Sequence, residues 1–150
     1  MEESWDDVIA SLSGAYGLTA GGSTLLEHSE LIVELSDAEA GADERRYRLR
    51  IYGAAWRLES GDDVLAGSAD ESDDLAAQVA RLDGQTLRSI TVEPRSLSAR
   101  FVFAGGLSLI TFSVYSHGFE HWALRRPDGT ELIAGPGSAW SFRAAEAPAS

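Results

Sequence analysis

Two histidines lie four residues apart, with His117 and His121 on either side of Gly118-Phe119-Glu120. On a helix, this spacing places both imidazoles on one face, where they can bind a metal ion together. Gly118 and the strand-like residues before it instead favour a loop, in which the spacing fixes no geometry. We keep His117, Glu120 and His121 as candidate metal ligands, while their context favours a structural role at the end of a strand.

The sequence contains no recognisable nucleophile or phosphate-binding motif. There are no cysteines, and Ser108 lacks the Gly-x-Ser-x-Gly arrangement of a nucleophile elbow. Gly135-Pro136-Gly137 and Gly21-Gly22 are not followed by the Lys-Ser/Thr pair of a phosphate loop. The adjacent aspartates have a structural explanation, because they fit the first turns of helices and tight turns. We therefore expect a non-enzymatic protein with no catalytic residues and no cofactor.

Acidic residues are concentrated in the first half of the chain, and the formal net charge is −12. Residues 1–75 hold 18 acids and 5 arginines, whereas residues 76–150 hold 6 acids and 7 arginines. Because nucleic-acid binding depends on neutralising phosphates, this charge argues against a nucleic-acid partner. It favours a basic protein partner, or a role of the charge in solubility alone. The candidate partner-binding residues are Asp37, Glu39, Asp43, Glu44, Asp62 and Asp63.

The length of 150 residues predicts one domain with a core that needs no disulfides or metals. The chain begins Met-Glu-Glu-Ser-Trp-Asp-Asp, which is acidic where a signal peptide is basic and then apolar. No uninterrupted apolar run approaches the length needed to span a membrane. We therefore expect a cytoplasmic protein without membrane association, and the oligomeric state is left open.

The two halves of the sequence share a pattern. Trp56-Arg57-Leu58, a polar turn and Val64-Leu65-Ala66-Gly67 reappear as Trp122-Ala123-Leu124, a polar turn and Leu132-Ile133-Ala134-Gly135. The two tryptophans are 66 residues apart, which is close to half the chain. An internal repeat of this kind predicts that each copy is one supersecondary unit packed against the other.

Each copy is expected to contain one helix followed by four or five antiparallel strands. Ser4 and Ser72 are positioned to cap helices that run to about Leu12 and Leu82. The alternation of apolar and charged residues over Tyr47–Ile51 is typical of a half-buried antiparallel strand. Strands or hairpins are predicted at 24–28, 31–35, 47–51, 56–65, 87–92, 97–103, 107–115 and 122–133.

The predicted fold class is therefore α+β, with two tandem copies in a pseudo-two-fold arrangement and helices covering a sheet face. The copies span about 4–69 and 71–140 of a single domain, and residues 143–150 are expected to form a frayed tail. The sequence leaves open whether the halves make one continuous sheet or two facing sheets.

Several turn motifs in the second half occur in a familiar order. They are Leu82-Asp83-Gly84-Gln85-Thr86-Leu87, Trp122-Ala123-Leu124, Pro127-Asp128-Gly129 and Gly135-Pro136-Gly137-Ser138-Ala139-Trp140. With these motifs, the region 82–140 resembles small β-rich domains of unknown function found in actinobacteria, which implies a fold but no activity. As a small acidic single-domain protein, the chain also resembles in composition the bacterial immunity proteins, which neutralise toxins by binding them.

Two functional hypotheses follow. The leading one is a non-enzymatic acidic interaction protein, in the form of a toxin-neutralising immunity protein that binds a basic partner. It rests on the uneven charge and on the lack of a catalytic motif. The alternative is a small-molecule or metal-binding protein that uses the groove between the two repeats, with His117, Glu120 and His121 at its edge.

Overall fold

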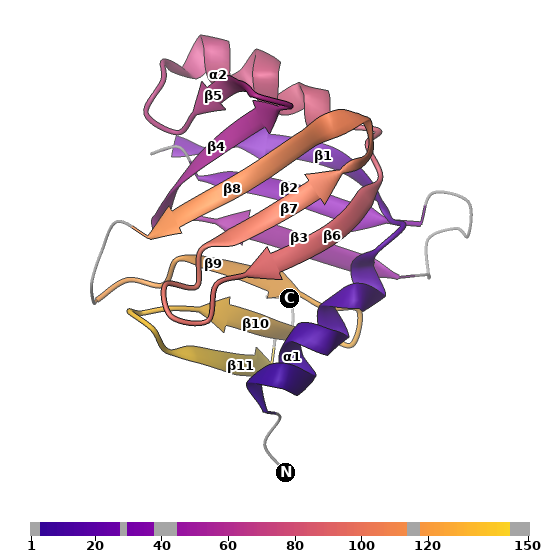
Figure 1. The fold of residues 1–150 in the computed structure, drawn as a ribbon, viewed down its shortest axis with the longest axis vertical. Helices are drawn as coiled ribbons and strands as arrows, with labels where there is room; N and C mark the ends of the chain where they lie inside the picture. Colours follow the sequence, from indigo (N-terminus) through magenta and orange to yellow (C-terminus); the bar gives the residue numbers. More distant parts are fainter. Residues whose placement is uncertain (1–3, 28–29, 38–44, 114–117, 145–150) are drawn as a thin grey trace, which may run out of the picture.

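Two antiparallel sheets stacked face to face make up most of the protein, with short helices at their margins (Figure 1). The computed structural model describes residues 4–27, 30–37, 45–113 and 118–144. Sheet A has the strand order β1-β2-β3-β9-β10-β11, and sheet B has the order β5-β4-β8-β7-β6. The α-helices and strands are α1 (Trp5–Ser11), β1 (Thr19–Leu25), β2 (Leu31–Ser36), β3 (Arg46–Ile51), β4 (Ala54–Ser60), β5 (Asp63–Gly67), α2 (Ser72–Val79), β6 (Leu87–Val92), β7 (Ala99–Phe103), β8 (Leu107–Ser113), β9 (Trp122–Arg125), β10 (Thr130–Ala134) and β11 (Trp140–Ala144). Short 3-10 helices are η1 (Leu12–Ala15), η3 (Ala80–Leu82) and η4 (Ala104–Gly106).

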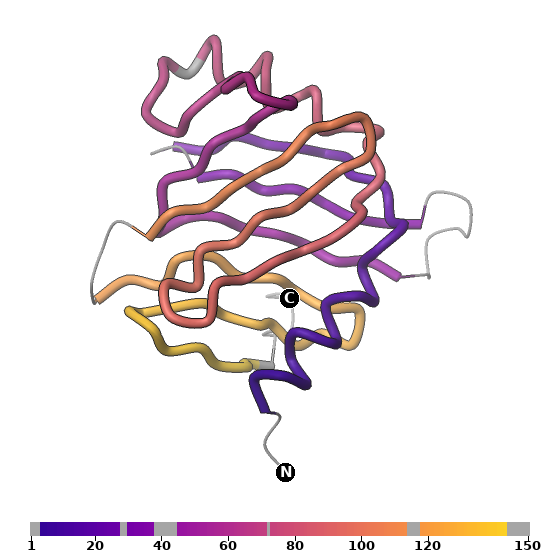
Figure 2. Tube along the Cα trace, in the orientation of Figure 1, coloured from indigo at the N-terminus to yellow at the C-terminus, as the bar shows by residue number. Residues whose placement is uncertain are grey.

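Each half of the chain contributes strands to both sheets. The first three strands lie together in sheet A, and the chain then crosses at Tyr52-Gly53 so that β4 and β5 join sheet B (Figure 2). In the second half, β6, β7 and β8 lie in sheet B, whereas β9, β10 and β11 join sheet A. The pairings of β3 with β9 and of β4 with β8 therefore join strands from opposite halves.

The prediction of an α+β fold built from two tandem, pseudo-two-fold copies is wrong. Most of the ordered structure is strand, and the α-helices have only seven and eight residues. The expected units 4–69 and 71–140 are not self-contained, because both sheets are assembled from strands of both halves. Trp56 consequently lies in sheet B and Trp122 in sheet A. A repeated local pattern specifies strands but not their partners, since pairing depends on which faces are buried together.

Both expected helices are present, and the antiparallel pairing is confirmed. At the start of α1, the Ser4 hydroxyl accepts a hydrogen bond from the Asp7 backbone N–H at 3.2 Å, and the Asp7 carboxylate accepts one from the Ser4 N–H at 3.4 Å. This reciprocal capping stabilises an isolated helix end. At α2, in contrast, the residue that precedes the helix is Glu71, and it makes no side-chain cap. Neither of the described α-helices is long and apolar enough to span a bilayer.

The ends of two strands differ from those predicted. β1 begins at Thr19 rather than Thr24, and its register with β2 shifts between Gly21 and Thr24. At the other end of the chain, Arg143 pairs with Glu131 in the β10–β11 ladder, although the tail was expected to fray from position 143. Residues 145–150 lie outside the described residues.

The core lies between the two sheets and is centred on aromatic side chains. Trp56, Trp122, Phe101 and Phe103 are among the largest fully buried residues. Phe101 of sheet B meets the Trp122 indole of sheet A edge-on, with ring centroids 6.0 Å apart. The indole Nε1 of Trp122 also donates a hydrogen bond to the carbonyl oxygen of Leu97 at 2.8 Å. Leu97 has a φ of 60°, a left-handed conformation that is uncommon outside glycine, so this bond secures a constrained residue.

The edge of sheet B at β6 is covered by the segment that follows α1. The Tyr16 hydroxyl accepts a hydrogen bond from the Ile90 N–H at 3.0 Å and donates one to the Ile90 carbonyl at 3.3 Å. Leu18 lies just before β1, and its carbonyl accepts a hydrogen bond of 2.8 Å from the N–H of Leu87, the first residue of β6. These contacts occupy backbone groups that would otherwise be available to another chain.

Replacing Trp122 by phenylalanine tests the link between the sheets. Because the Leu97 carbonyl then stays buried without its donor, we expect Trp122→Phe to lower the unfolding free energy by about 1–3 kcal/mol. Trp122→Ala also leaves a cavity, and we expect it to cost about 3–5 kcal/mol. Urea denaturation measures both losses. Trp5→Phe, at a partly buried tryptophan that packs on Trp140, is the matched control, and a loss as large as that of Trp122→Phe would contradict this role.

Candidate functional site

The three predicted metal ligands are only partly described. His117 lies outside the described residues. The carboxylate of Glu120 accepts a hydrogen bond from the Tyr52 hydroxyl and lies 3.6 Å from Arg143. His121 is buried, and its Nε2 lies 3.1 Å from the hydroxyl of Ser113. Glu120 and His121 thus have different partners, and the described residues contain no group of three or more acids and histidines that could hold a metal ion. A site that includes His117 remains a prediction.

His121 occupies a tightly enclosed position immediately before β9. Its Nδ1 is buried without a hydrogen-bond partner. Gly135, at a φ of +93°, leaves the room for the ring, because a Cβ there would lie 2.7 Å from the imidazole Cδ2. The carbonyl of His121 accepts hydrogen bonds from the N–H groups of Tyr52 (3.2 Å) and Gly53 (3.1 Å). His121 therefore fixes the place where the chain crosses between the sheets.

A row of charged side chains crosses five strands on the outer face of sheet A. Residues paired in register share one face of a sheet, and the alternate residues of these strands point into the core. The paired positions, in order from β2 to β11, are Glu34, Arg48, Arg125, Glu131 and Arg143.

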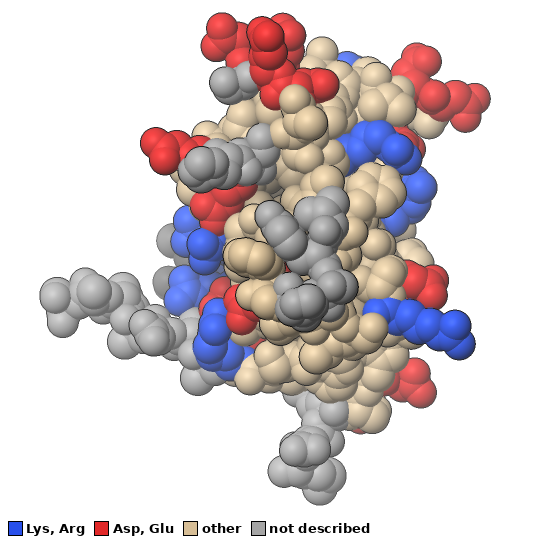
Figure 3. All heavy atoms as spheres, turned by 90° about the vertical axis from the view of Figure 1, so that its left-hand side faces the viewer, with Lys and Arg blue, Asp and Glu red and all other residues tan. Residues whose placement is uncertain are grey.

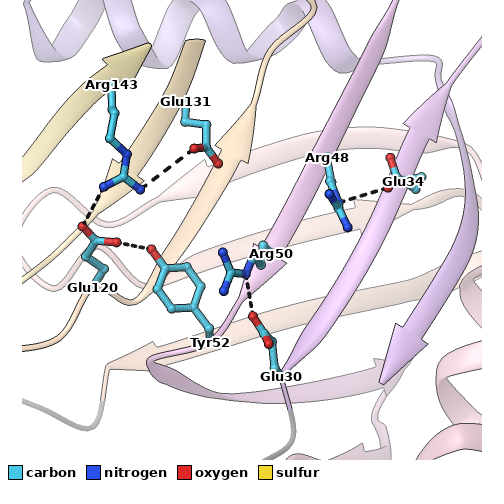
Figure 4. A network of polar contacts seen from close by, with 8 residues as sticks. All are labelled: Glu30, Glu34, Arg48, Arg50, Tyr52, Glu120, Glu131 and Arg143. Atoms are coloured by element: carbon cyan, nitrogen blue, oxygen red, sulfur yellow. Dashed lines mark hydrogen bonds and ion pairs between the residues drawn. The ribbon is translucent and has the colours of Figure 1, made fainter. Parts of the chain in front are cut away.

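Ion pairs hold two of these arginines (Figure 4). Nε of Arg48 lies 3.1 Å from a carboxylate oxygen of Glu34. The guanidinium of Arg143 lies between two carboxylates, 3.6 Å from Glu120 and 3.9 Å from Glu131. Since all these side chains are partly exposed, each pair contributes little to stability, but together they restrict where the guanidinium groups lie.

Arg50 is held from two sides. It forms an ion pair of 2.5 Å with Glu30, and its guanidinium carbon lies 4.6 Å from the centroid of the Tyr52 ring (Figure 4). The Tyr52 hydroxyl donates a hydrogen bond to Glu120. Burial, and then this hydrogen bond, raise the pKa of Tyr52 well above its ordinary value of 10.0, so the hydroxyl stays protonated and remains a donor.

Five side chains of this face line an open hollow of about 420 Å³, which we call the arginine hollow. Beneath this face, Ala123 and Ile133 are only 2% and 1% exposed although both point outward. Outward-facing apolar residues are buried to this extent when long side chains lie across them. The residues that line the hollow are Arg48, Arg50, Arg125, Glu131 and Arg143.

Of the candidate partner-binding residues, two lie in an exposed turn. Asp62 and Asp63 form the turn between β4 and β5 and are exposed. Asp37, at the end of β2, is half-buried and lies 3.7 Å from the guanidinium of Arg45. The three remaining candidates, which lie outside the described residues, are Glu39, Asp43 and Glu44.

Acidic residues lie at both ends of β5, the outermost strand of sheet B. We call these exposed residues, together with the strand between them, the acidic edge. Figure 3 shows acidic side chains gathered at the end of the molecule where Figure 1 places α2 and β5. Val64 of β5 is 59% exposed, and it is the most exposed of the large apolar side chains among the described residues. The carboxylates are Asp62, Asp63, Asp70, Glu71, Asp73 and Asp74.

Comparison with protein-family models, with curated proteins and with solved structures found no match to this chain.

Lowering the pH is expected to destabilise the protein through His121. Burial lowers the pKa of His121 below its ordinary value of 6.5, at which the unfolded chain titrates. Below that pH, the unfolded state takes up a proton that the folded state resists, so the unfolding free energy falls as the pH falls. Above it, both states hold a neutral imidazole and this contribution is constant.

An NMR titration of the imidazole signals measures this pKa directly. Urea denaturation between about pH 8 and about pH 5.5 should show a shallower loss of stability in His121→Gln than in the wild type. A His121 titration midpoint at or above the ordinary value would contradict the prediction.

Proposed function

We propose that this chain is a non-enzymatic interaction protein whose acidic edge docks a basic protein partner. The observation that carries the proposal is an exposed apolar residue, Val64, on an edge strand with exposed carboxylates at both ends. An apolar contact surrounded by charged groups is the usual composition of a protein–protein interface.

Part of the acidic edge has a structural explanation within the chain. Asp73 and Asp74 lie in the first turn of α2, where the helix dipole favours carboxylates. The carboxylate of Asp70 accepts a hydrogen bond from the Gly67 N–H at 2.9 Å. These three acids would be expected at a helix start even in a protein with no partner.

The other three acids lie outside α2, and although aspartate suits the turn at 62 and 63, no side-chain hydrogen bond or ion pair holds them among the described residues. Asp62, Asp63 and Glu71 are exposed, and none of them has a cationic partner in the part of the chain that the structure describes. Their charges repel one another in the isolated protein, whereas a basic surface would neutralise them. Such complementarity mainly speeds association and makes it sensitive to salt. A basic toxin that is neutralised by binding is the partner that fits the resemblance to immunity proteins.

Affinity capture at low and high salt tests the acidic edge. Asp62→Asn/Asp63→Asn/Glu71→Gln removes three charges from the acidic edge, and Val64→Ser removes its apolar contact. We expect the wild type to capture a basic protein at low salt, and we expect high salt or either variant to reduce that capture strongly.

Asp6→Asn/Glu27→Gln/Glu93→Gln is the matched control, since it makes the same change in net charge at exposed residues that do not belong to the acidic edge. The captured protein is then purified, and its affinity is measured for each variant. Failure of the wild type to retain any basic protein, or equal losses in the triple variant and the control, would refute the proposal.

A further inference from the structure

Two arginines face each other directly on the outer face of sheet A. Arg48 of β3 and Arg125 of β9 are register partners, and like charges in this position destabilise a sheet. Arg48 is compensated on its other side by Glu34. Arg125 has Glu131 as its register partner on β10, but the Glu131 carboxylate lies against Arg143 instead. Arg125 thus makes no ion pair or side-chain hydrogen bond within the described part of the chain.

The lining of the arginine hollow is mainly cationic in a protein whose net charge is strongly negative, although Glu30, Glu34 and Glu120 lie beside it and pair with three of its arginines. Four arginines and a single glutamate line it. Its volume of about 420 Å³ lies within the range of small-molecule sites, which is roughly 300–1,000 Å³. An anion entering the hollow would neutralise Arg125, which pairs with no carboxylate in the described part of the chain, and would thereby offset its repulsion with Arg48.

Three of the four arginines that line the hollow are already held by ion pairs, and Arg125 is the exception. Arg50 lies between Glu30 and the ring of Tyr52, and Arg143 lies between Glu120 and Glu131. The hydrogen bond from Tyr52 to Glu120 joins these two groups into one network (Figure 4). Binding an anion then requires little further ordering of side chains, which lowers the entropic cost of binding.

We propose that the arginine hollow binds a phosphoryl dianion between Arg48 and Arg125. A tetrahedral phosphoryl group presents oxygen atoms in several directions, so it can accept hydrogen bonds from two guanidinium groups on opposite sides. A monocarboxylate presents its two oxygen atoms in one plane, so it bridges two guanidinium groups on opposite sides less well. The phosphoryl group belongs to a small phosphate monoester or to inorganic phosphate, and the site is separate from the acidic edge.

Thermal unfolding and calorimetry with defined probes test the proposal. The probes are inorganic phosphate and glycerol 3-phosphate, with acetate and sodium chloride at matched ionic strength for comparison. We expect phosphate and the monoester to raise the unfolding temperature of the wild type well above the effect of acetate or chloride. Arg125→Gln should weaken phosphate binding about tenfold or more, because it removes one of the two charged donors.

Arg88→Gln is the matched control, since Arg88 is an exposed arginine on β6 of sheet B, and it should bind phosphate like the wild type. Without phosphate, Arg125→Gln should unfold at the same or a higher temperature than the wild type, because it relieves the repulsion. Arg48→Gln, at the facing position, is a second variant with the same expected loss of binding.

Equal binding of phosphate by the wild type and Arg125→Gln, or an equal effect of acetate and phosphate, would overturn the proposal. Binding of inorganic phosphate without the monoester would identify the free ion as the ligand.

Discussion

The burial of the Trp122 indole between the two sheets is the interaction on which the rest of the structure depends. Its ring meets Phe101 of the opposite sheet, and its N–H satisfies the carbonyl of Leu97. Because Trp122 points into the core, the alternation along β9 directs Leu124 inward and Arg125 outward. The uncompensated position of Arg125 therefore follows from the packing of the core and not from any contact of its own.

Signals contained in a few neighbouring residues predicted local structure well. The alternation over Tyr47–Ile51 identified a half-buried strand, and the Ser4 cap identified the start of α1. The strands predicted at 97–103 and 107–115 are present as β7 and β8, which pair with each other, and the region predicted at 122–133 contains the hairpin of β9 and β10. In each case the energy that decides the conformation comes from adjacent side chains and from turn geometry.

Strand partners and the charged row could not be predicted in this way. The repeated Trp-x-Leu pattern suggested two tandem copies packed against each other. Trp56 and Trp122 are both buried, but they lie in different sheets, and each sheet is built from both halves of the chain. Arg48 and Arg125 are 77 residues apart in the sequence and become neighbours only when β3 pairs with β9. The alternating arginines of β3 were visible in the sequence, but they looked like the solvated side of an ordinary strand. The turn at Asp62 and Asp63 was easier to predict, because an exposed turn needs no distant partner.

The exchange of strands between the halves affects how the chain folds during synthesis. The first five strands leave the ribosome before β8 and β9 are synthesised. Until then, β3 lacks its partner β9 and β4 lacks its partner β8, so each has one unpaired edge. Pairing across such long separations is slow, and an exposed edge can meanwhile associate with the same edge of another nascent chain. The first half of the chain, residues 1–75, carries 18 acids and 5 arginines, so two nascent copies of it repel each other. The uneven charge of this sequence thus opposes edge-to-edge aggregation during the interval when the fold is incomplete.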